Sequence, residues 1–183
     1  MSIVSITLIM FILVVGLSVL WSTLRTGMPP MPSLGASGRA MLSLVHRSPS
    51  GAIADMGSGW GTLAVAFARR FPETRVVGYE ISFFPWLFSR CLARALGLSN
   101  LRFYRLDFRN TDLMGVSVLV CYLMPKGMEA IRKRLETDPG SVEVVISHYF
   151  ALRGWKADDV VELSDLYRTP VYRYDLRKRL SPG

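Results

Sequence analysis

The sequence predicts an α/β fold whose seven-stranded sheet is mostly parallel and ends in an antiparallel hairpin. Three observations support this class. The stretch GAIADMGSGWG (51–61) has the pattern of a buried strand that turns sharply into a helix. Apolar strand patterns then alternate with helical patterns as far as residue 148. Two last strand patterns follow without a helix between them, as expected of an antiparallel edge hairpin.

The elements follow in order along the chain. Helical spacing predicts helices at 36–46, 62–71, 85–97 and 124–137. Strands are expected at 52–55, 75–79, 101–106, 116–122, 142–148, 160–163 and 170–174. Proline and glycine mark several boundaries: Pro72 closes one helix, Pro85 suits a first helical position, and Gly97 is a C-terminal stop.

The N-terminal segment is apolar. Met1 to Leu24 carry no charged side chain, and a membrane span needs about 20 residues. A cleaved signal peptide is the alternative, but no Lys or Arg precedes the apolar run. We therefore expect a transmembrane anchor at 1–25, a Pro-rich linker at 26–35 and one domain at 36–183. Arginines follow the segment, which predicts a single-pass membrane protein with that domain on the cytoplasmic side.

Composition limits the possible partners and metals. The 183 residues carry a net charge of +8, which suits nucleic acid, an anionic membrane face or simply an arginine-rich surface. Cys91 and Cys121 show no metal-binding or disulfide spacing, so we expect buried thiols and no metal site. His46 and His148 are isolated in the sequence, and we expect both to be structural.

The glycine turn indicates the kind of ligand. A dinucleotide fingerprint GxGxxG would require a third glycine at position 62, which is Thr62. Asp55, two residues before the first glycine, would repel a pyrophosphate. S-adenosylmethionine has no phosphate and carries an ammonium and a sulfonium, so an acid nearby is favourable. Asp55 therefore favours S-adenosylmethionine.

Two further acids follow strands. Glu80 ends the second predicted strand and can accept hydrogen bonds from ribose hydroxyls. Asp107 ends the third, where the adenine edge would lie. Either acid alone could be a helix cap or a turn residue. Because parallel strands end at one edge of the sheet, the acids together with the glycine turn favour a shared cofactor site.

The chain resembles class I S-adenosylmethionine-dependent methyltransferases, with their Rossmann-like fold. More closely, DMGSGWG, VVGYEIS-x-x-PWLFSR, FYRLDF and CYLMPKGM resemble the lysine methyltransferases of the ATP synthase c-subunit methyltransferase family and their bacterial relatives. The resemblance covers about residues 32–176. One departure lies in the turn, where that family has an acid and this chain has Trp60.

The resemblance implies a set of site residues. Those expected to bind the cofactor are Asp55, Gly57, Ser58, Gly59, Gly61, Glu80, Ile81, Asp107 and Phe108. Those expected beside the transferred methyl group are Tyr122, Leu123 and Pro125, although Tyr122 is equally well explained as a core aromatic. The aromatic stretch Phe83–Trp86 is a candidate lid or membrane-facing patch, and ordinary helix packing explains it as well.

The function expected is that of a membrane-anchored protein-lysine N-methyltransferase acting on a membrane-associated protein. Two alternatives stay open: methylation of a small or lipid-like molecule, and a non-catalytic, membrane-tethered scaffold that binds the cofactor. Nucleic acid is not expected as a partner, because CYLMP (121–125) lacks the Asn/Asp-Pro-Pro-aromatic signature of many nucleic-acid amino-methylating enzymes. Desolvation and the sulfonium both lower the pKa of a bound lysine, so no dedicated base is required, and the sequence identifies none.

Overall fold

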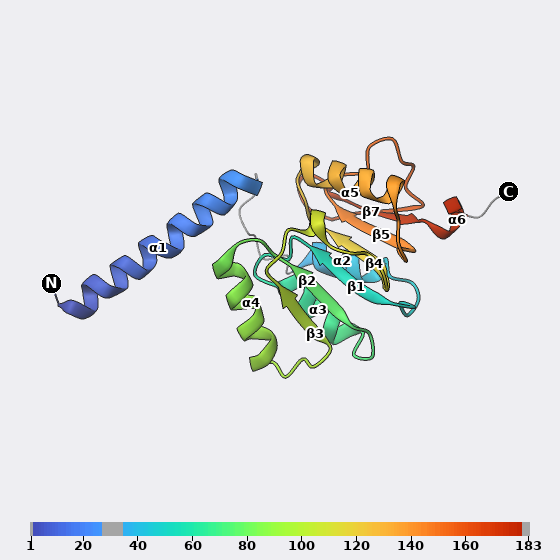
Figure 1. Ribbon diagram of the computed structural model, residues 1–183. Coiled ribbons are helices and arrows are strands. Elements are labelled where there is room, and N and C mark those ends of the chain that lie inside the picture. Colours follow the sequence, from blue (N-terminus) through green and yellow to red (C-terminus); the bar gives the residue numbers. More distant parts are fainter. Residues whose placement is uncertain (1, 27–34, 181–183) are drawn as a thin grey trace.

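The computed structural model describes the backbone of residues 2–26 and 35–180, and their side chains except at positions 11, 15, 18–26 and 180. Figure 1 shows the arrangement of the elements. The strands are β1 (Ala52–Met56), β2 (Val76–Tyr79), β3 (Leu101–Tyr104), β4 (Val116–Cys121), β5 (Val144–His148), β6 (Asp159–Glu162) and β7 (Pro170–Asp175). The helices are α1 (Ile3–Thr26), α2 (Ala36–Ser43), α3 (Thr62–Arg70), α4 (Phe83–Ala95), α5 (Pro125–Thr137), α6 (Arg177–Leu180) and the 3-10 turn η1 (Phe108–Asn110).

The seven strands form one sheet in the order β3-β2-β1-β4-β5-β7-β6. The first five run parallel, whereas β7 is antiparallel to both of its neighbours, β5 and β6. The predicted parallel sheet with an antiparallel hairpin is therefore confirmed. Because β6 is antiparallel to β7, it runs in the same direction as β5, and both end at one edge of the sheet.

Each face of the sheet carries its own apolar core. On one face, Ile53, Val118 and Ile146 pack with α2, α3 and α4. On the other face, Ala54 and Leu119 pack with α5 and with the segment that follows β5. All residues of β1, β4 and β5 are buried, as expected for central strands covered on both faces.

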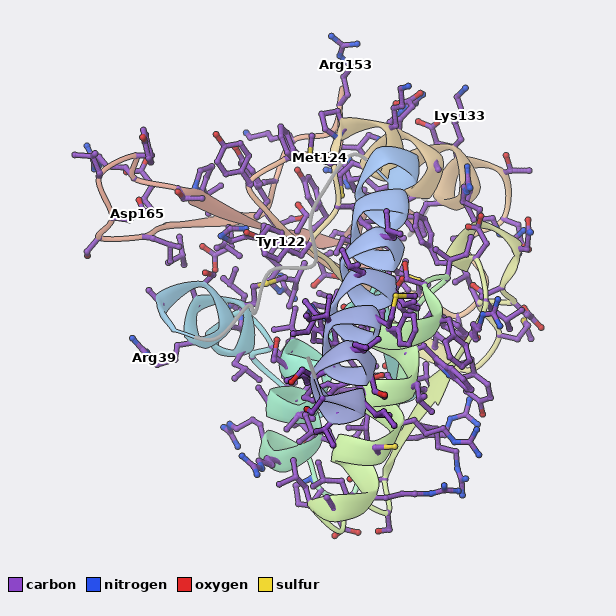
Figure 2. All side chains as sticks on the ribbon, turned by 90° about the vertical axis from the view of Figure 1, so that its left-hand side faces the viewer. Arg39, Tyr122, Met124, Lys133, Arg153 and Asp165 are labelled. Carbon is purple, nitrogen blue, oxygen red and sulfur yellow. The ribbon has the colours of Figure 1, made fainter. Side chains whose placement is uncertain are left out.

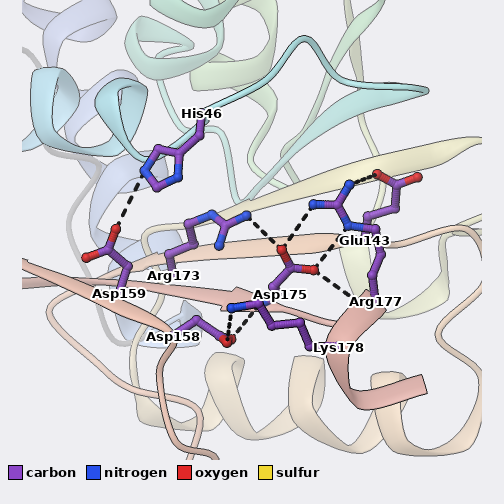
Figure 3. A network of polar contacts seen from close by, with 8 residues as sticks. All are labelled: His46, Glu143, Asp158, Asp159, Arg173, Asp175, Arg177 and Lys178. Carbon is purple, nitrogen blue, oxygen red and sulfur yellow. Dashed lines mark hydrogen bonds and ion pairs between the residues drawn. The ribbon is translucent and has the colours of Figure 1, made fainter. Parts of the chain in front are cut away.

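A polar network fastens the C-terminal strand and helix (Figure 3). The Asp175 carboxylate accepts hydrogen bonds from Arg173, which is itself buried in β7, and from Arg177 in α6. Arg177 also lies 3.5 Å from Glu143, and the Asp175 N–H donates to Asp158. Hydrogen bonds from Arg177 and Arg173 lower the pKa of Asp175 to about 2 although the group is buried.

Helix α1 lies outside the α/β body and contacts α4 (Figure 1). Its described apolar side chains, such as Ile3 and Leu8, are exposed and belong to neither core. Within residues 2–26 and 35–180, no helix combines the length and apolarity required to cross a membrane. The predicted transmembrane helix and single-pass membrane location are therefore wrong, and the expected contact with a lipid bilayer has no support.

Several predicted boundaries shift. Helix α4 begins at Phe83 rather than Pro85, because the first turn of a helix tolerates proline without a backbone N–H. Strand β3 ends at Tyr104, two residues early, where the chain turns toward η1. Strand β5 begins at Val144 rather than at 142. The division into segments 1–25, 26–35 and 36–183 remains a prediction, and residues 27–34 of the linker lie outside the described residues.

Candidate active site at the carboxyl edge of the sheet

The turn from β1 into α3 is a cradle of bare backbone. Gly57, Gly59 and Gly61 have φ of 78°, 52° and 79°, the left-handed region that glycine adopts without strain. The N–H groups of Gly57 and Ser58 both donate to the Tyr79 carbonyl at the end of β2, at 3.0 and 2.9 Å. The turn is therefore fixed to the neighbouring strand.

Glu80 holds this cradle from the end of β2. One of its carboxylate oxygens accepts from the Gly59 N–H at 2.9 Å, and the other accepts from the Ser82 N–H at 2.7 Å. The residue is 8% exposed. An ionised carboxylate has about four lone-pair sites. Glu80 can therefore accept further hydrogen bonds, as a vicinal diol would require.

Asp55 lies one strand away, at the end of β1. It is 2% exposed, and within the described residues its Oδ2 has no hydrogen-bond partner. Burial and the nearby Glu80 charge raise the pKa of Asp55 to about 7, although a backbone hydrogen bond from Ala64 lowers it. A buried carboxylate oxygen without a partner fits a positively charged ligand group, because such a group would supply both a hydrogen bond and the missing charge.

Asp107 is the first residue of the turn that follows β3. Its carboxylate accepts from the backbone N–H of Arg109 at 3.0 Å and pairs with the Arg109 guanidinium at 2.5 Å. The same contact raises the pKa of Arg109. Phe108 is half-buried against the α5 core. Asp107 therefore lies beyond the end of β3, as predicted, but its carboxylate is already paired with Arg109. The sequence did not predict this ion pair.

The substrate-side candidates approach the glycine turn from β4. Leu123 is buried, and a side chain at Gly57 would come within 2.9 Å of its Cδ2 atom. Pro125 begins α5, and Tyr122 lies half-buried between these elements and the hairpin. Figure 2 looks onto this edge and shows Tyr122 and Met124 between the hairpin bearing Asp165 and the helix bearing Lys133. The fold therefore brings the end of β4 against the cofactor turn.

The aromatic residues near the turn pack in different ways. Trp60 meets the ring of Phe88 in α4 edge-on at 5.3 Å. Trp86 donates its indole N–H to the Phe103 carbonyl in β3 at 3.2 Å, and its ring centroid lies 5.9 Å from that of Phe83. These contacts join α4 to the turn and to β3, so helix packing accounts for Trp60 and Trp86, whereas Phe83 stays 43% exposed.

Two further features of this edge were missed from the sequence. A cavity of about 870 Å³ lies between the start of α5 and the segment after β5, and its lining includes Pro125, Phe150 and Arg153. His148, expected to be merely structural, ends β5 directly beside Tyr122. The register of β4 and β5 brings His148 next to Tyr122, and the cavity forms between segments that are distant in the sequence. No local sequence pattern could therefore reveal either feature. Among the described residues, no cluster of His, Cys, Asp or Glu could hold a metal ion.

A strand, glycine turn and helix, an acid ending the second strand, and a reversed strand inserted next to β5 define a class I S-adenosylmethionine-dependent methyltransferase. Comparison with known proteins then gives the family. A profile of the ANTKMT methyltransferase domain matches residues 55–159, and the chain belongs to that family. The predicted enzyme class and its methyl donor are therefore confirmed.

Individual relatives agree with this class. The ATP synthase c-subunit lysine N-methyltransferase of Xenopus laevis is 29% identical over 136 residues, which are 73% of this chain and 58% of the relative. This chain thus spans little more than half of that relative's length. A protein-lysine N-methyltransferase of Saccharolobus islandicus is 24% identical over 144 residues, 75% of this chain and 86% of that protein.

Among solved structures, an RNA methyltransferase from Salinibacter ruber in complex with S-adenosyl-L-homocysteine is similar with a TM-score of 0.70 and 25% identity. The match covers 84% of this chain and 98% of that one. A putative tRNA methyltransferase from Streptococcus pneumoniae, at 18% identity and a TM-score of 0.58 over 79% of each chain, shares the fold.

Proposed function

We propose that this chain is a protein-lysine N-methyltransferase that uses S-adenosylmethionine at the carboxyl edge of its sheet. The observation that carries the proposal is the convergence of three features there: the glycine cradle, the Glu80 carboxylate that braces it, and the unpartnered oxygen of Asp55. The names of the Xenopus and Saccharolobus relatives support lysine as the acceptor.

The residues present fit this cofactor. In the proposal, Gly57, Ser58, Gly59 and Gly61 line its amino-acid portion, and Asp55 faces the positive charge there. Glu80, with Ile81 beside it, uses its remaining acceptor capacity for the ribose hydroxyls. Phe108 and Asp107 flank the adenine, which requires Asp107 to share its carboxylate between Arg109 and the base. When bound, S-adenosylmethionine supplies a methyl carbon activated by its sulfonium.

Positioning is the main contribution expected of the protein. The acceptor side is lined by Tyr122, Leu123 and Pro125. Holding an amine there in near-attack geometry can lower the activation barrier by about 7–11 kcal/mol. A lysine amine must also lose a proton. With a pKa near 10.4 this costs about 4–5 kcal/mol at pH 7.

The test is methyl transfer from isotopically labelled S-adenosylmethionine by the full chain into a protein extract of source cells that lack the gene. We expect label on lysine side chains of one or a few proteins, located by peptide mass spectrometry. Glu80→Ala should abolish the label, whereas Glu73→Ala, on an exposed turn, should not. Binding of the cofactor without transfer to any component would instead support the scaffold alternative.

RNA is a second candidate acceptor. The match to the Salinibacter RNA methyltransferase and the net charge of +8 favour it. The sequence CYLMP at the end of β4 opposes it. Total RNA and a small-molecule and lipid fraction from the same cells therefore serve as parallel substrates, and label in either fraction without label on lysine would overturn the lysine proposal.

A further inference from the structure

His148 emerges at the acceptor side of the site. Strands β4 and β5 are parallel with Cys121 opposite Ser147, so the next residues, Tyr122 and His148, lie side by side at the ends of these strands. Their ring centroids are 4.4 Å apart, and the planes meet at 78°. The imidazole thus packs directly on a residue expected beside the transferred methyl group.

The imidazole is buried with its hydrogen-bonding capacity unused. His148 is 4% exposed, and neither Nδ1 nor Nε2 has a partner in the described part of the chain. Leaving a buried polar group unpaired costs about 1–3 kcal/mol, so such groups call for a functional or ligand-based explanation. Burial also lowers the pKa of His148, although the charge of Asp165 opposes this, so the ring is neutral at pH 7 and can accept a proton.

Backbone strain marks the same position. Tyr149, directly after His148, has φ of 71°, which is rare for a bulky residue. The Phe150 N–H donates to the His148 carbonyl at 2.9 Å and closes a three-residue turn of a strained type. The Tyr149 N–H is held by the Pro170 carbonyl at the start of β7. Strain of this kind concentrates at functional sites, where surrounding structure maintains it.

The other charged and titratable groups around His148 are already engaged or lie elsewhere. Asp165, in the β6–β7 loop, accepts from the backbone and hydroxyl of Thr169 at 2.8 and 2.5 Å. Arg173 on β7 pairs with Asp175. The charged residue of α2, Arg39, is exposed on the outer side of that helix (Figure 2). Burial raises the pKa of the Tyr122 phenol, which therefore stays protonated. Of these described side chains, His148 is the one whose ring nitrogen atoms keep no hydrogen-bond partner.

We propose that His148 is the catalytic base that takes the proton from the substrate lysine before methyl transfer. The inference rests on the proposed lysine methyltransferase function. One ring nitrogen accepts a proton from the lysine ammonium. The freed amine lone pair then forms the N–C bond as the methyl C–S bond breaks, and that bond's electron pair stays on sulfur. The imidazolium returns its proton to solvent, so one proton is released per methyl group transferred.

The test uses His148→Asn with His46→Asn as its matched control. These are the two histidines of the chain, and His46 lies at the surface, 3.5 Å from Asp159. Both variants receive the lysine substrate found by the labelling experiment. We expect His148→Asn to lower kcat by about 10²- to 10⁴-fold with little change in KM or in cofactor affinity. With S-adenosylmethionine and the lysine substrate both saturating, which removes the effect of Asp55 on cofactor affinity, the wild-type kcat should fall at acidic pH as the imidazole becomes protonated, and the Asn variant should lose that inflection.

A measurement without turnover keeps the proposal testable if the variant misfolds. ¹⁵N-imidazole NMR of the full wild-type chain should show the His148 ring neutral at pH 7, with a resonance that moves when n-butylamine is added with S-adenosyl-L-homocysteine. The His46→Asn chain should retain that signal. Three results would contradict the role of His148 as catalytic base: a charged His148 at pH 7, a His148 resonance unchanged by the amine, or His148→Asn activity within threefold of wild type. None of these would contradict the proposed methyltransferase function. A wild-type chain that methylates no lysine would overturn both.

Discussion

At the scale of single residues, the site depends on two carboxylates in different states. Glu80 is held by two backbone N–H groups, whereas Asp55 is equally buried and retains an oxygen without a partner in the described chain. The contrast indicates different tasks. Glu80 organises the glycine turn without ligand, whereas in the proposed site Asp55 Oδ2 gains its partner when the positive group of the cofactor binds.

Cofactor binding should therefore release a proton from Asp55. Without ligand its pKa of about 7 leaves much of the carboxyl protonated at pH 6, and a bound cation favours the carboxylate. Affinity should rise with pH up to about 7, by at most about tenfold per pH unit, and then level off. Calorimetry in two buffers of different ionisation enthalpy measures this release. Asp55→Asn should remove it, whereas Asp138→Asn, on an exposed carboxyl, should not.

The same carboxyl should affect stability. Because the pKa of Asp55 is raised in the folded state, the unfolded chain ionises first, and stability without ligand should fall as pH rises from about 4 to 7. At pH 8, Asp55→Asn should be more stable than wild type by about 1–4 kcal/mol. Urea unfolding at pH 5 and pH 8 checks this. A variant that is less stable than wild type at pH 8 would contradict the unsatisfied state of Asp55.

At the scale of elements, the β1–α3 turn depends on close packing as much as on conformation. A Cβ at Gly61 would lie 2.6 Å from both Phe103 Cζ and Ser89 Cβ, and φ there is 79°. Gly97, after α4, has a similar φ of 64° but no atom within 4 Å of such a Cβ. Alanine at Gly97 would therefore bear only the cost of the left-handed backbone, whereas alanine at Gly61 would also clash with neighbouring side chains.

Gly61→Ala should destabilise the chain by about 2–5 kcal/mol, because overpacking costs about 1–3 kcal/mol in addition to about 1–2 kcal/mol for the left-handed backbone. Gly97→Ala should cost only the backbone share, about 1–2 kcal/mol. Urea denaturation of both variants measures the difference. Equal losses would show that the turn has room for a side chain and would contradict the packed cradle.

Sequence patterns predicted most elements because buried parallel strands and amphipathic helices have strong periodic signals. They did not predict that β7 lies between β5 and β6, since strand order depends on pairing between distant residues. For the same reason, they missed the meeting of His148 with Tyr122 and the cavity near Pro125. The expected membrane span relied on the apolar composition of one segment, and no helix of the described residues meets the requirement.

At the scale of the whole molecule, a polar network joins β7 and α6 to Glu143, the residue before β5 (Figure 3). Arg173 is buried, and its charge is balanced by Asp175. Removing one partner of a buried ion pair is expensive because the other charge stays behind uncompensated. The network should therefore stabilise the sheet where β7 ends beside the start of β5, because Asp175 pairs with Val144 there.

Asp175→Asn should lower the free energy of unfolding by about 3–5 kcal/mol at pH 7. The matched control, Asp138→Asn, breaks an exposed pair with Arg134 and should cost at most about 1 kcal/mol. Because the pKa of Asp175 is lowered to about 2, its contribution is complete above about pH 4 and is lost as pH falls toward 2. Thermal unfolding at pH 7 and pH 3 should show the gap between wild type and Asp175→Asn narrowing in acid. A gap that is constant with pH would contradict an ionic role.

The most direct test of the central claim is calorimetric titration of S-adenosylmethionine into the full chain. The strand-end site predicts one binding site per chain, with affinity at least about tenfold weaker in Glu80→Ala, which removes the acceptor of the Gly59 and Ser82 N–H groups. Glu73→Ala should bind like wild type. No binding by the wild-type chain, or equal affinity in Glu80→Ala, would contradict a cofactor site at the carboxyl edge of this sheet.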